Sequence, residues 1–164
     1  MANQNTHHIN RRDFIMKTSA AVAGTGLCIC GIGGCATLTG TGSTPQIAKT
    51  AIAQVNDELV IDVTKVAELS VVGGAVKIAG KNNIKPIIIA RVNESSFVVA
   101  SLVCPHRGVE MEYENEAMNF SCASLGNSTF KLDGEKVSGP AKNNLQIFSN
   151  IFADGKLTIS GVIV

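Results

Sequence analysis

Two short segments of the sequence place cysteine and histidine where they could bind a metal. Cys104 and His106 are separated only by Pro105, whose ring restricts the backbone. Fifteen residues then separate His106 from Cys122, which opens a second segment rich in Ser and Gly. Thiolate and imidazole suit iron and related metals. Two loops that each offer such ligands predict one metal centre held between them.

The residues around these segments predict an all-β domain. From Leu59 onward, apolar residues alternate with polar ones or form short runs, separated by Gly, Asn and Asp. Many short strands with tight turns predict a small antiparallel sandwich or barrel with two metal-binding loops. One or two helical turns are expected at residues 63–69. The expected strands are 58–63, 75–80, 86–92, 96–102, 109–114, 119–122, 144–149 and 156–160.

The spacing of the cysteines and the histidine resembles the Rieske family of [2Fe-2S] proteins. That family has Cys-x-His, about fifteen residues, and then Cys-x-x-His followed by Gly and a loop that ends in an aromatic residue. The segments "TFKLDGEKVSGPA" and "LQIF" also match, and Ser138–Ala141 corresponds to the proline loop that shields the cluster. The resemblance covers about residues 85–159. It implies that Cys104 and Cys122 bind one iron and that His106 binds the other.

The second histidine of the family pattern is missing. Counting from Cys122 without a gap places it at Leu125, which has no ligand atom. The loop is also one residue longer than usual before Phe130. If the extra residue lies early in the loop, the ligand position moves to Asn127.

No other histidine is available to replace it, because His7 and His8 lie near the N-terminus. The amide oxygen of Asn127 is a hard, weak donor for iron that is bound to sulfide. The alternatives are an alkoxide of Ser124 or Ser128, a water molecule, or an external ligand. We therefore expect a [2Fe-2S] cluster that is bound less tightly than in a protein with all four ligands.

A second departure concerns the family's disulfide. Rieske proteins of quinol-oxidising complexes carry one additional cysteine in each loop, and these positions are Val109 and Ser124 here. The resemblance is therefore to the disulfide-free branch, which contains ferredoxin-like proteins and small subunits of oxidases.

The N-terminal residues 1–35 predict an export signal. Arg11 and Arg12 precede Phe14 and a weakly apolar segment, which resembles a twin-arginine signal. The sequence "IGGC" at Ile32–Cys35 resembles a lipobox, so cleavage before Cys35 would leave that residue acylated. The alternative is an uncleaved membrane anchor. Both interpretations predict a tethered protein in the periplasm or on the outer face of the membrane, with a flexible linker at 36–52 and a Rieske-type domain at 53–164.

Charge and composition narrow the range of partners. Beyond residue 35 there are 11 Lys and Arg residues against 12 Asp and Glu residues, which excludes a basic field for nucleic acid. Four glutamates at positions 110, 112, 114 and 116 alternate with other residues and predict one acidic strand face. That face could dock a basic redox partner, or it could simply be solvated.

Two functions remain open from the sequence. The first is an exported, membrane-tethered electron-transfer protein, acting alone or as the small subunit of an oxidoreductase with a redox partner. The twin-arginine route favours it, since that route moves folded, cofactor-loaded proteins. The second is a metal-free Rieske-fold structural or binding module, with a disulfide between Cys104 and Cys122. An electron carrier or redox subunit is expected rather than a stand-alone enzyme.

Overall fold

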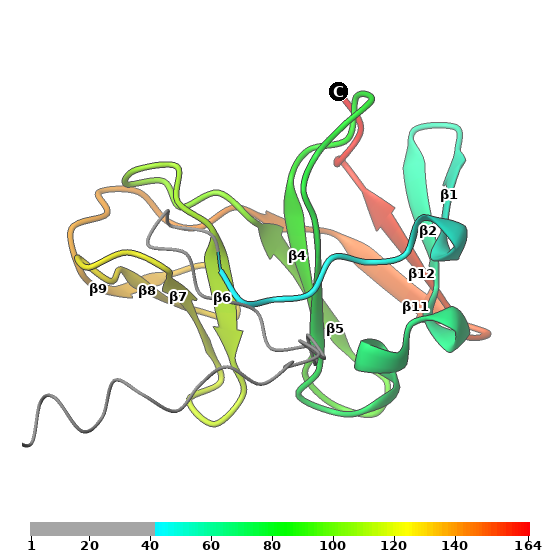
Figure 1. Cartoon of the computed structure of the whole chain (residues 1–164), viewed down its shortest axis with the longest axis horizontal. Coiled ribbons are helices and arrows are strands. Elements are labelled where there is room, and N and C mark those ends of the chain that lie inside the picture. The colour runs from blue at the N-terminus through cyan, green and yellow to red at the C-terminus, as the bar shows by residue number, and fades with distance from the viewer. Residues whose placement is uncertain (1–41) are drawn as a thin grey trace, which may run out of the picture. The chain divides into compact units, whose positions relative to one another are not determined.

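Twelve β-strands and three short 3-10 helices form the part of the chain that the computed structural model describes, residues 42–164 (Figure 1). The predicted export signal and Cys35 lie outside these residues. Within residues 42–164 no helix is long and apolar enough to cross a membrane. The 3-10 helices are η1 (Lys49–Ala51), η2 (Val63–Lys65) and η3 (Ala67–Ser70), so residues 63–69 form helical turns as predicted.

The strands pair into three antiparallel sheets, each of four strands. The base sheet has the order β1 (Ile52–Val55), β2 (Glu58–Asp62), β12 (Lys156–Ser160), β11 (Asn150–Ala153). The middle sheet has the order β10 (Ile147–Phe148), β5 (Phe97–Ser101), β4 (Ile87–Arg91), β3 (Ala75–Ile78). The site sheet has the order β6 (Met111–Glu114), β7 (Asn119–Cys122), β8 (Thr129–Lys131), β9 (Lys136–Ser138). The predicted all-β, antiparallel fold is confirmed.

Each of the eight predicted strands contains an observed strand. Four further strands, β1, β8, β9 and β11, were not expected. Three of these lie at the edge of a sheet and are largely exposed, so their side chains do not alternate between buried and exposed. The fourth, β8, has only three residues. In neither case does the sequence contain an alternation of apolar and polar residues that is long enough to predict a strand.

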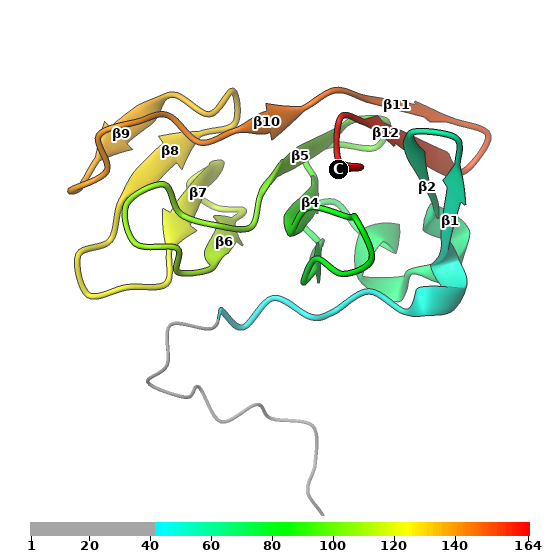
Figure 2. The same cartoon turned by 90° about the horizontal axis from the view of Figure 1, so that it is seen from above.

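The middle sheet separates two hydrophobic cores. In β4, Ile87 and Ile89 pack into the base core, whereas Ile88 and Ala90 pack into the site core. Successive side chains of a strand point to opposite faces, so a run of four buried apolar residues is the pattern of a strand covered on both faces. Figure 2 shows β4 and β5 between the strands of the base sheet and those of the site sheet.

The two cores contain different residues. The base core contains Ile47, Ala51, Leu59, Ile61, Val63, Val66, Leu69, Val76, Ile78, Ile87, Ile89, Phe97, Val99, Phe148, Leu157, Ile159 and Val162. The site core contains Ile88, Ala90, Ala100, Leu102, Cys104, Met111, Phe120, Cys122, Phe130, Ala141 and Leu145. Both cores and all three sheets lie within residues 42–164, so this part of the chain has a complete interior of its own.

The segment before β1 packs on the middle sheet. The N–H of Ile47 donates to the carbonyl of Lys77 at 3.0 Å, and the N–H of Lys77 donates to the carbonyl of Pro45 at 2.8 Å. Ile47 and Ala51 are buried. This part of the predicted 36–52 linker therefore contributes to the base core, and ordered structure begins before residue 53.

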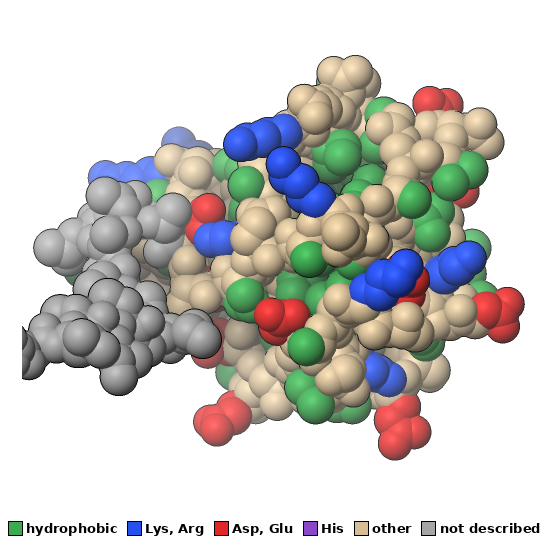
Figure 3. Space-filling model, turned by 45° about the vertical axis from the view of Figure 1, so that its right-hand side comes forward, with side chains coloured by type: hydrophobic (Ala, Val, Ile, Leu, Met, Phe, Trp, Pro, Cys, Tyr) green, Lys and Arg blue, Asp and Glu red, His purple; other side chains and the backbone are tan. Residues whose placement is uncertain are grey.

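The acidic face of β6 is largely used inside the molecule. Glu110 forms an ion pair with Lys77 at 2.7 Å, Glu112 accepts a hydrogen bond from the Ser43 hydroxyl at 2.7 Å, and Glu114 accepts one from Ser121 at 2.9 Å. Figure 3 shows acidic and basic side chains interspersed on one face of the molecule. These contacts give the alternating glutamates a structural role that neither interpretation from the sequence included.

Candidate metal centre

The first loop of the candidate site connects β5 to β6 and contains Cys104 and His106. It is closed by the Cys104 N–H, which donates to the Val109 carbonyl at 2.8 Å, and by the Gly108 N–H, which donates to the Cys104 carbonyl at 2.9 Å. Gly108 has a φ of 71°, a left-handed conformation that residues with a side chain rarely adopt. The loop is therefore a tight turn that begins at a cysteine.

The second loop connects β7 to β8 and begins after Cys122. The Cys122 N–H donates to the Ser128 carbonyl at 3.0 Å, and the Asn127 N–H donates to the Ser124 carbonyl at 3.0 Å. The four residues from Ser124 to Asn127 thus form a turn, and Cys122 stays at the end of a paired strand.

The segment Ser138–Ala141 is tied to this second loop. The buried hydroxyl of Ser128 accepts a hydrogen bond from the Ala141 N–H at 3.0 Å. Gly139 has a φ of 86°, and a Cβ there would lie 2.5 Å from the Asn127 carbonyl oxygen, so only glycine fits. The "SGPA" sequence therefore packs against the second loop, where the family resemblance places a shielding segment.

The two cysteines lie together in the site core. Both side chains are buried and both thiols are free, so the disulfide of the alternative interpretation is not formed in this structure. Burial raises the pKa of the Cys104 thiol, the backbone N–H of His106 opposes this, and the adjacent Cys122 thiol raises the pKa further. The Cys122 Sγ also lies 3.2 Å from the Ser124 Oγ. A pair of adjacent thiols with backbone N–H groups nearby is suited to bind a metal as thiolates.

The imidazole of His106 has an unused nitrogen. Among the residues that the structure describes, its Nδ1 atom has no hydrogen-bond partner although the atom is buried. A buried polar atom without a partner is unfavourable, and each such atom in a native structure needs an explanation. Coordination of a metal by Nδ1 would supply one.

The two predicted positions of the fourth ligand lie in the exposed part of the second loop. Leu125 is fully exposed, with a relative accessibility of 111%, and Asn127 is exposed as well. A Cβ on Gly126, which is exposed too, would lie 3.8 Å from the His106 Cε1 and 3.3 Å from the Pro140 Cγ. Gly126 therefore lies close to the imidazole ring. The sequence did not reveal this, because only residues that carry a donor were considered.

The donor set fits part of a two-iron cluster. Within residues 42–164, no group of three or more His, Cys, Asp or Glu side chains could hold one metal ion. A Rieske cluster does not require such a group, since two cysteines bind one iron and two histidines the other. Cys104 and Cys122 match the first pair, and the free Nδ1 of His106 matches one member of the second. The second imidazole has no counterpart.

A comparison with known families covers this whole region. A sequence model described as the Rieske [2Fe-2S] domain matches residues 60–149, which is more than half of the chain and includes Cys104, His106 and Cys122. The chain belongs to the Rieske [2Fe-2S] domain family. Rieske proteins carry an iron–sulfur cluster, transfer electrons and generally work with redox partners or within larger complexes. No curated protein matches the chain.

Two solved structures are similar to this Rieske protein. The cyanobacterial plasma membrane Rieske protein PetC3 from Synechocystis PCC 6803 is 18% identical, with 58% of this chain and 94% of that chain covered and a TM-score of 0.48. The ferredoxin of carbazole 1,9a-dioxygenase from Nocardioides aromaticivorans IC177 is 13% identical, with 55% and 86% covered and a TM-score of 0.47.

Proposed function

We propose that this Rieske protein is an exported, membrane-tethered electron-transfer protein whose [2Fe-2S] cluster lacks one histidine ligand. It acts alone or as the small subunit of an oxidoreductase. The observation that carries the proposal is the pair of adjacent, buried, free thiols beside a buried imidazole nitrogen without a partner.

The residues of the two loops have distinct roles in this proposal. Cys104 and Cys122 bind one iron, and the Nδ1 of His106 binds the other. When bound, the cluster accepts and donates single electrons. The backbone N–H groups of His106 and Arg107 lower the pKa of the Cys104 sulfur and so favour its thiolate form, although burial opposes them more strongly. Gly126 lies near both the His106 ring and Pro140 and is the proposed place for a further ligand.

The proposed location rests on the N-terminal sequence. Export through the twin-arginine route requires Arg11 and Arg12, and an acyl chain on Cys35 provides the tether. Gly42 is only seven positions after Cys35, a reach of at most about 25 Å. Replacing both arginines by lysine should trap the protein in the cytosol, and Cys35→Ala should abolish acylation. A cytosolic protein that keeps its complete N-terminus would contradict this part of the proposal.

Metal content tests the cofactor directly. We expect the protein, purified without oxygen, to contain iron and acid-labile sulfide, and to show an electron paramagnetic resonance signal after reduction. Cys122→Ser should lose both the cluster and its signal, because the iron that the two cysteines bind would then keep only one cysteine sulfur. Ser149→Ala, at an exposed position between β10 and β11 that is no candidate ligand, is the control and should keep both. If the wild-type protein holds no iron and mass spectrometry shows a Cys104–Cys122 disulfide, the metal-free module is the correct function.

The missing ligand can be tested by adding an imidazole. Gly126→His should raise the iron content most, because its side chain would start 3.8 Å from the His106 ring. Asn127→His, at the position of the gapped alignment, should raise it less, and Leu125→His least, since Leu125 is fully exposed. Gly126→Ala adds the same Cβ without a ligand and controls for crowding against Pro140. The highest iron content in Leu125→His would support the ungapped alignment instead.

A further inference from the structure

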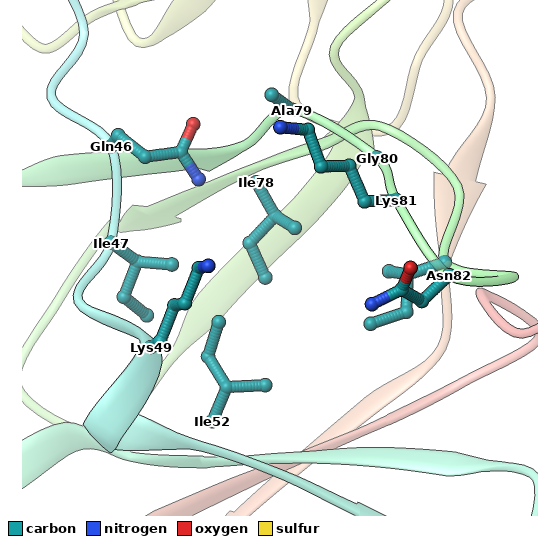
Figure 4. Close-up of a pocket in the computed structure, with 10 residues that line it drawn as sticks. Gln46, Ile47, Lys49, Ile52, Ile78, Ala79, Gly80, Lys81 and Asn82 are labelled. Atoms are coloured by element: carbon teal, nitrogen blue, oxygen red, sulfur yellow. The ribbon is translucent and has the colours of Figure 1, made fainter.

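A pocket lies on the opposite side of the middle sheet from the candidate metal centre. It has a volume of about 460 Å³, within the usual range for small-molecule sites. Its walls come from the segment Gln46–Ile52 and from the connection between β3 and β4, Ile78–Ile84. Figure 4 shows these two stretches on opposite sides of the space.

The floor of the pocket is apolar and continuous with the base core. Ile47 and Ile78 are core residues, and Ile52 and Ile84 are partly buried and pack against that core. An apolar group that entered the pocket would replace water on the parts of Ile52 and Ile84 that remain exposed, which is favourable in proportion to the area removed from water.

The polar part of the rim carries positive charge only. Lys49 and Lys81 line the pocket together with Gln46 and Asn82, and no carboxylate lines it. Figure 4 shows the two lysines on different sides of Ile78. Neither lysine forms an ion pair with another residue of 42–164, whereas Lys65, Lys77 and Lys131 do. The pocket therefore presents two uncompensated cations above an apolar floor.

The backbone of both walls is fixed before any ligand binds. The hydrogen bonds between Ile47, Lys77 and Pro45 hold the first wall on β3. In the second wall, the Ile84 N–H donates to the Lys81 carbonyl at 3.1 Å. Gly80 has a φ of 72°, and a Cβ there would lie 2.9 Å from the Pro86 nitrogen, so this turn needs glycine. A preformed site loses little ordering entropy when a ligand binds.

We propose that this pocket binds a small anionic amphiphile, with the apolar body on the isoleucines and the carboxylate or phosphate group between Lys49 and Lys81. The same chemistry occurs in free single-chain carboxylates and in anionic lipids. The proposal does not depend on the cofactor or on the export signal, because no residue of the candidate metal centre lines the pocket.

The test uses the chain from Gly34 to Val164, which forms one compact unit and contains both cores. Titration with decanoate, followed by amide chemical shifts, should give a saturable response confined to the two walls of the pocket. Decanol should bind about tenfold more weakly, because a hydrogen bond to a charged group contributes about 1.5–3 kcal/mol. The double variant Lys49→Gln with Lys81→Gln should lose this preference for the acid. Lys142→Gln, an exposed lysine elsewhere, should keep it.

A second arm separates the two sources of the anion. Vesicles of phosphatidylglycerol and of phosphatidylcholine are compared in a sedimentation assay. Recruitment to phosphatidylglycerol that is lost in the double lysine variant identifies a membrane lipid as the ligand. A decanoate response without recruitment identifies a free acid. Either result supports the proposal. If decanoate and decanol bind equally, or if neither decanoate nor phosphatidylglycerol binds, the proposal is wrong.

Discussion

The two cores on either side of the middle sheet are built from different residues. The base core has seventeen buried residues, and all of them are aliphatic or Phe. The site core has eleven, which include both thiols, Met111 and three alanines. Apolar area removed from water is the main source of stability. The base region therefore has the larger hydrophobic contribution, and the site region holds its loops with less.

The site region is held together largely by specific hydrogen bonds, whereas the base region is held together largely by hydrophobic packing. Its loops are closed by the Cys104–Val109 and Cys122–Ser128 backbone hydrogen bonds and by the contact of Ser128 with Ala141. Such bonds contribute about 1 kcal/mol each. We therefore expect a bound metal to stabilise the site region more than the base region.

The largest difference between the regions should appear when iron is removed. Reduction and chelation should speed amide hydrogen exchange in β7 and β8 by about tenfold or more, since a bound metal contributes to the stability of the structure that provides its ligands. Exchange in β2 and β12 should change much less. The measurement is hydrogen exchange by mass spectrometry on the loaded and the metal-free protein. An equal acceleration in both regions would mean that the two cores unfold as one unit.

Neighbouring residues of β4 test the same division by mutation. Ile88 and Ile89 are both fully buried, but they belong to different cores. Ile88→Ala and Ile89→Ala should each lower the free energy of unfolding by about 2–5 kcal/mol, because each leaves a cavity. Only Ile88→Ala should also lower the iron content.

The paired design keeps this test informative if an alanine variant does not fold. Ile88→Val and Ile89→Val remove one methylene group each and should cost about 0.5–1.5 kcal/mol. Iron content and chemical denaturation are measured on all four variants. A loss of iron in Ile89→Val that matches the loss in Ile88→Val would argue against the separation of the cores.

A smaller effect is expected where the middle sheet meets the site sheet. Glu110 precedes β6 and accepts hydrogen bonds from Lys77 of β3 and from the Gly42 N–H, each at 2.7 Å. Glu110→Gln should cost about 1–3 kcal/mol, since it leaves a partly buried ammonium group without its carboxylate. Glu116→Gln, in the exposed turn after β6, is the control and should cost little. Urea denaturation measures the cost of both substitutions, and equal costs would show that the ion pair does not stabilise the contact between these two sheets.

The smallest effect should be confined to the base region and should depend on pH. A side-chain hydrogen bond from Lys65, and then one from Thr64, lower the pKa of Asp62 below its ordinary value of 3.8. This contribution to stability is present above that value and is lost as the pH falls through the lowered pKa. Asp62→Asn should therefore destabilise the protein slightly at pH 7 and not at low pH. Urea midpoints at both pH values test this, and iron content at pH 7 should not change.

The sequence was sufficient for the fold class and for three of the proposed ligands. Alternating apolar residues revealed eight strands, because a strand with one buried face imposes a period of two on its own residues. The spacing of Cys104, His106 and Cys122 identified the family, since the two loops that carry ligands are short and continuous in sequence. Both features depend on residues that are close together along the chain.

Other features depended on contacts between residues that are distant in sequence. The division of Ile87–Ala90 between two cores, the ion pair of Glu110 with Lys77, and the pocket lined by two lysines all require separate segments to meet. The proximity of Gly126 to His106 is a further case, because Gly126 has no side chain and only the packing of the two loops reveals its place. A sequence determines which groups a chain has and the pattern they follow locally. The tertiary structure decides which of them lie within reach of each other, because hydrogen bonds, ion pairs and metal ligation act over only a few ångströms.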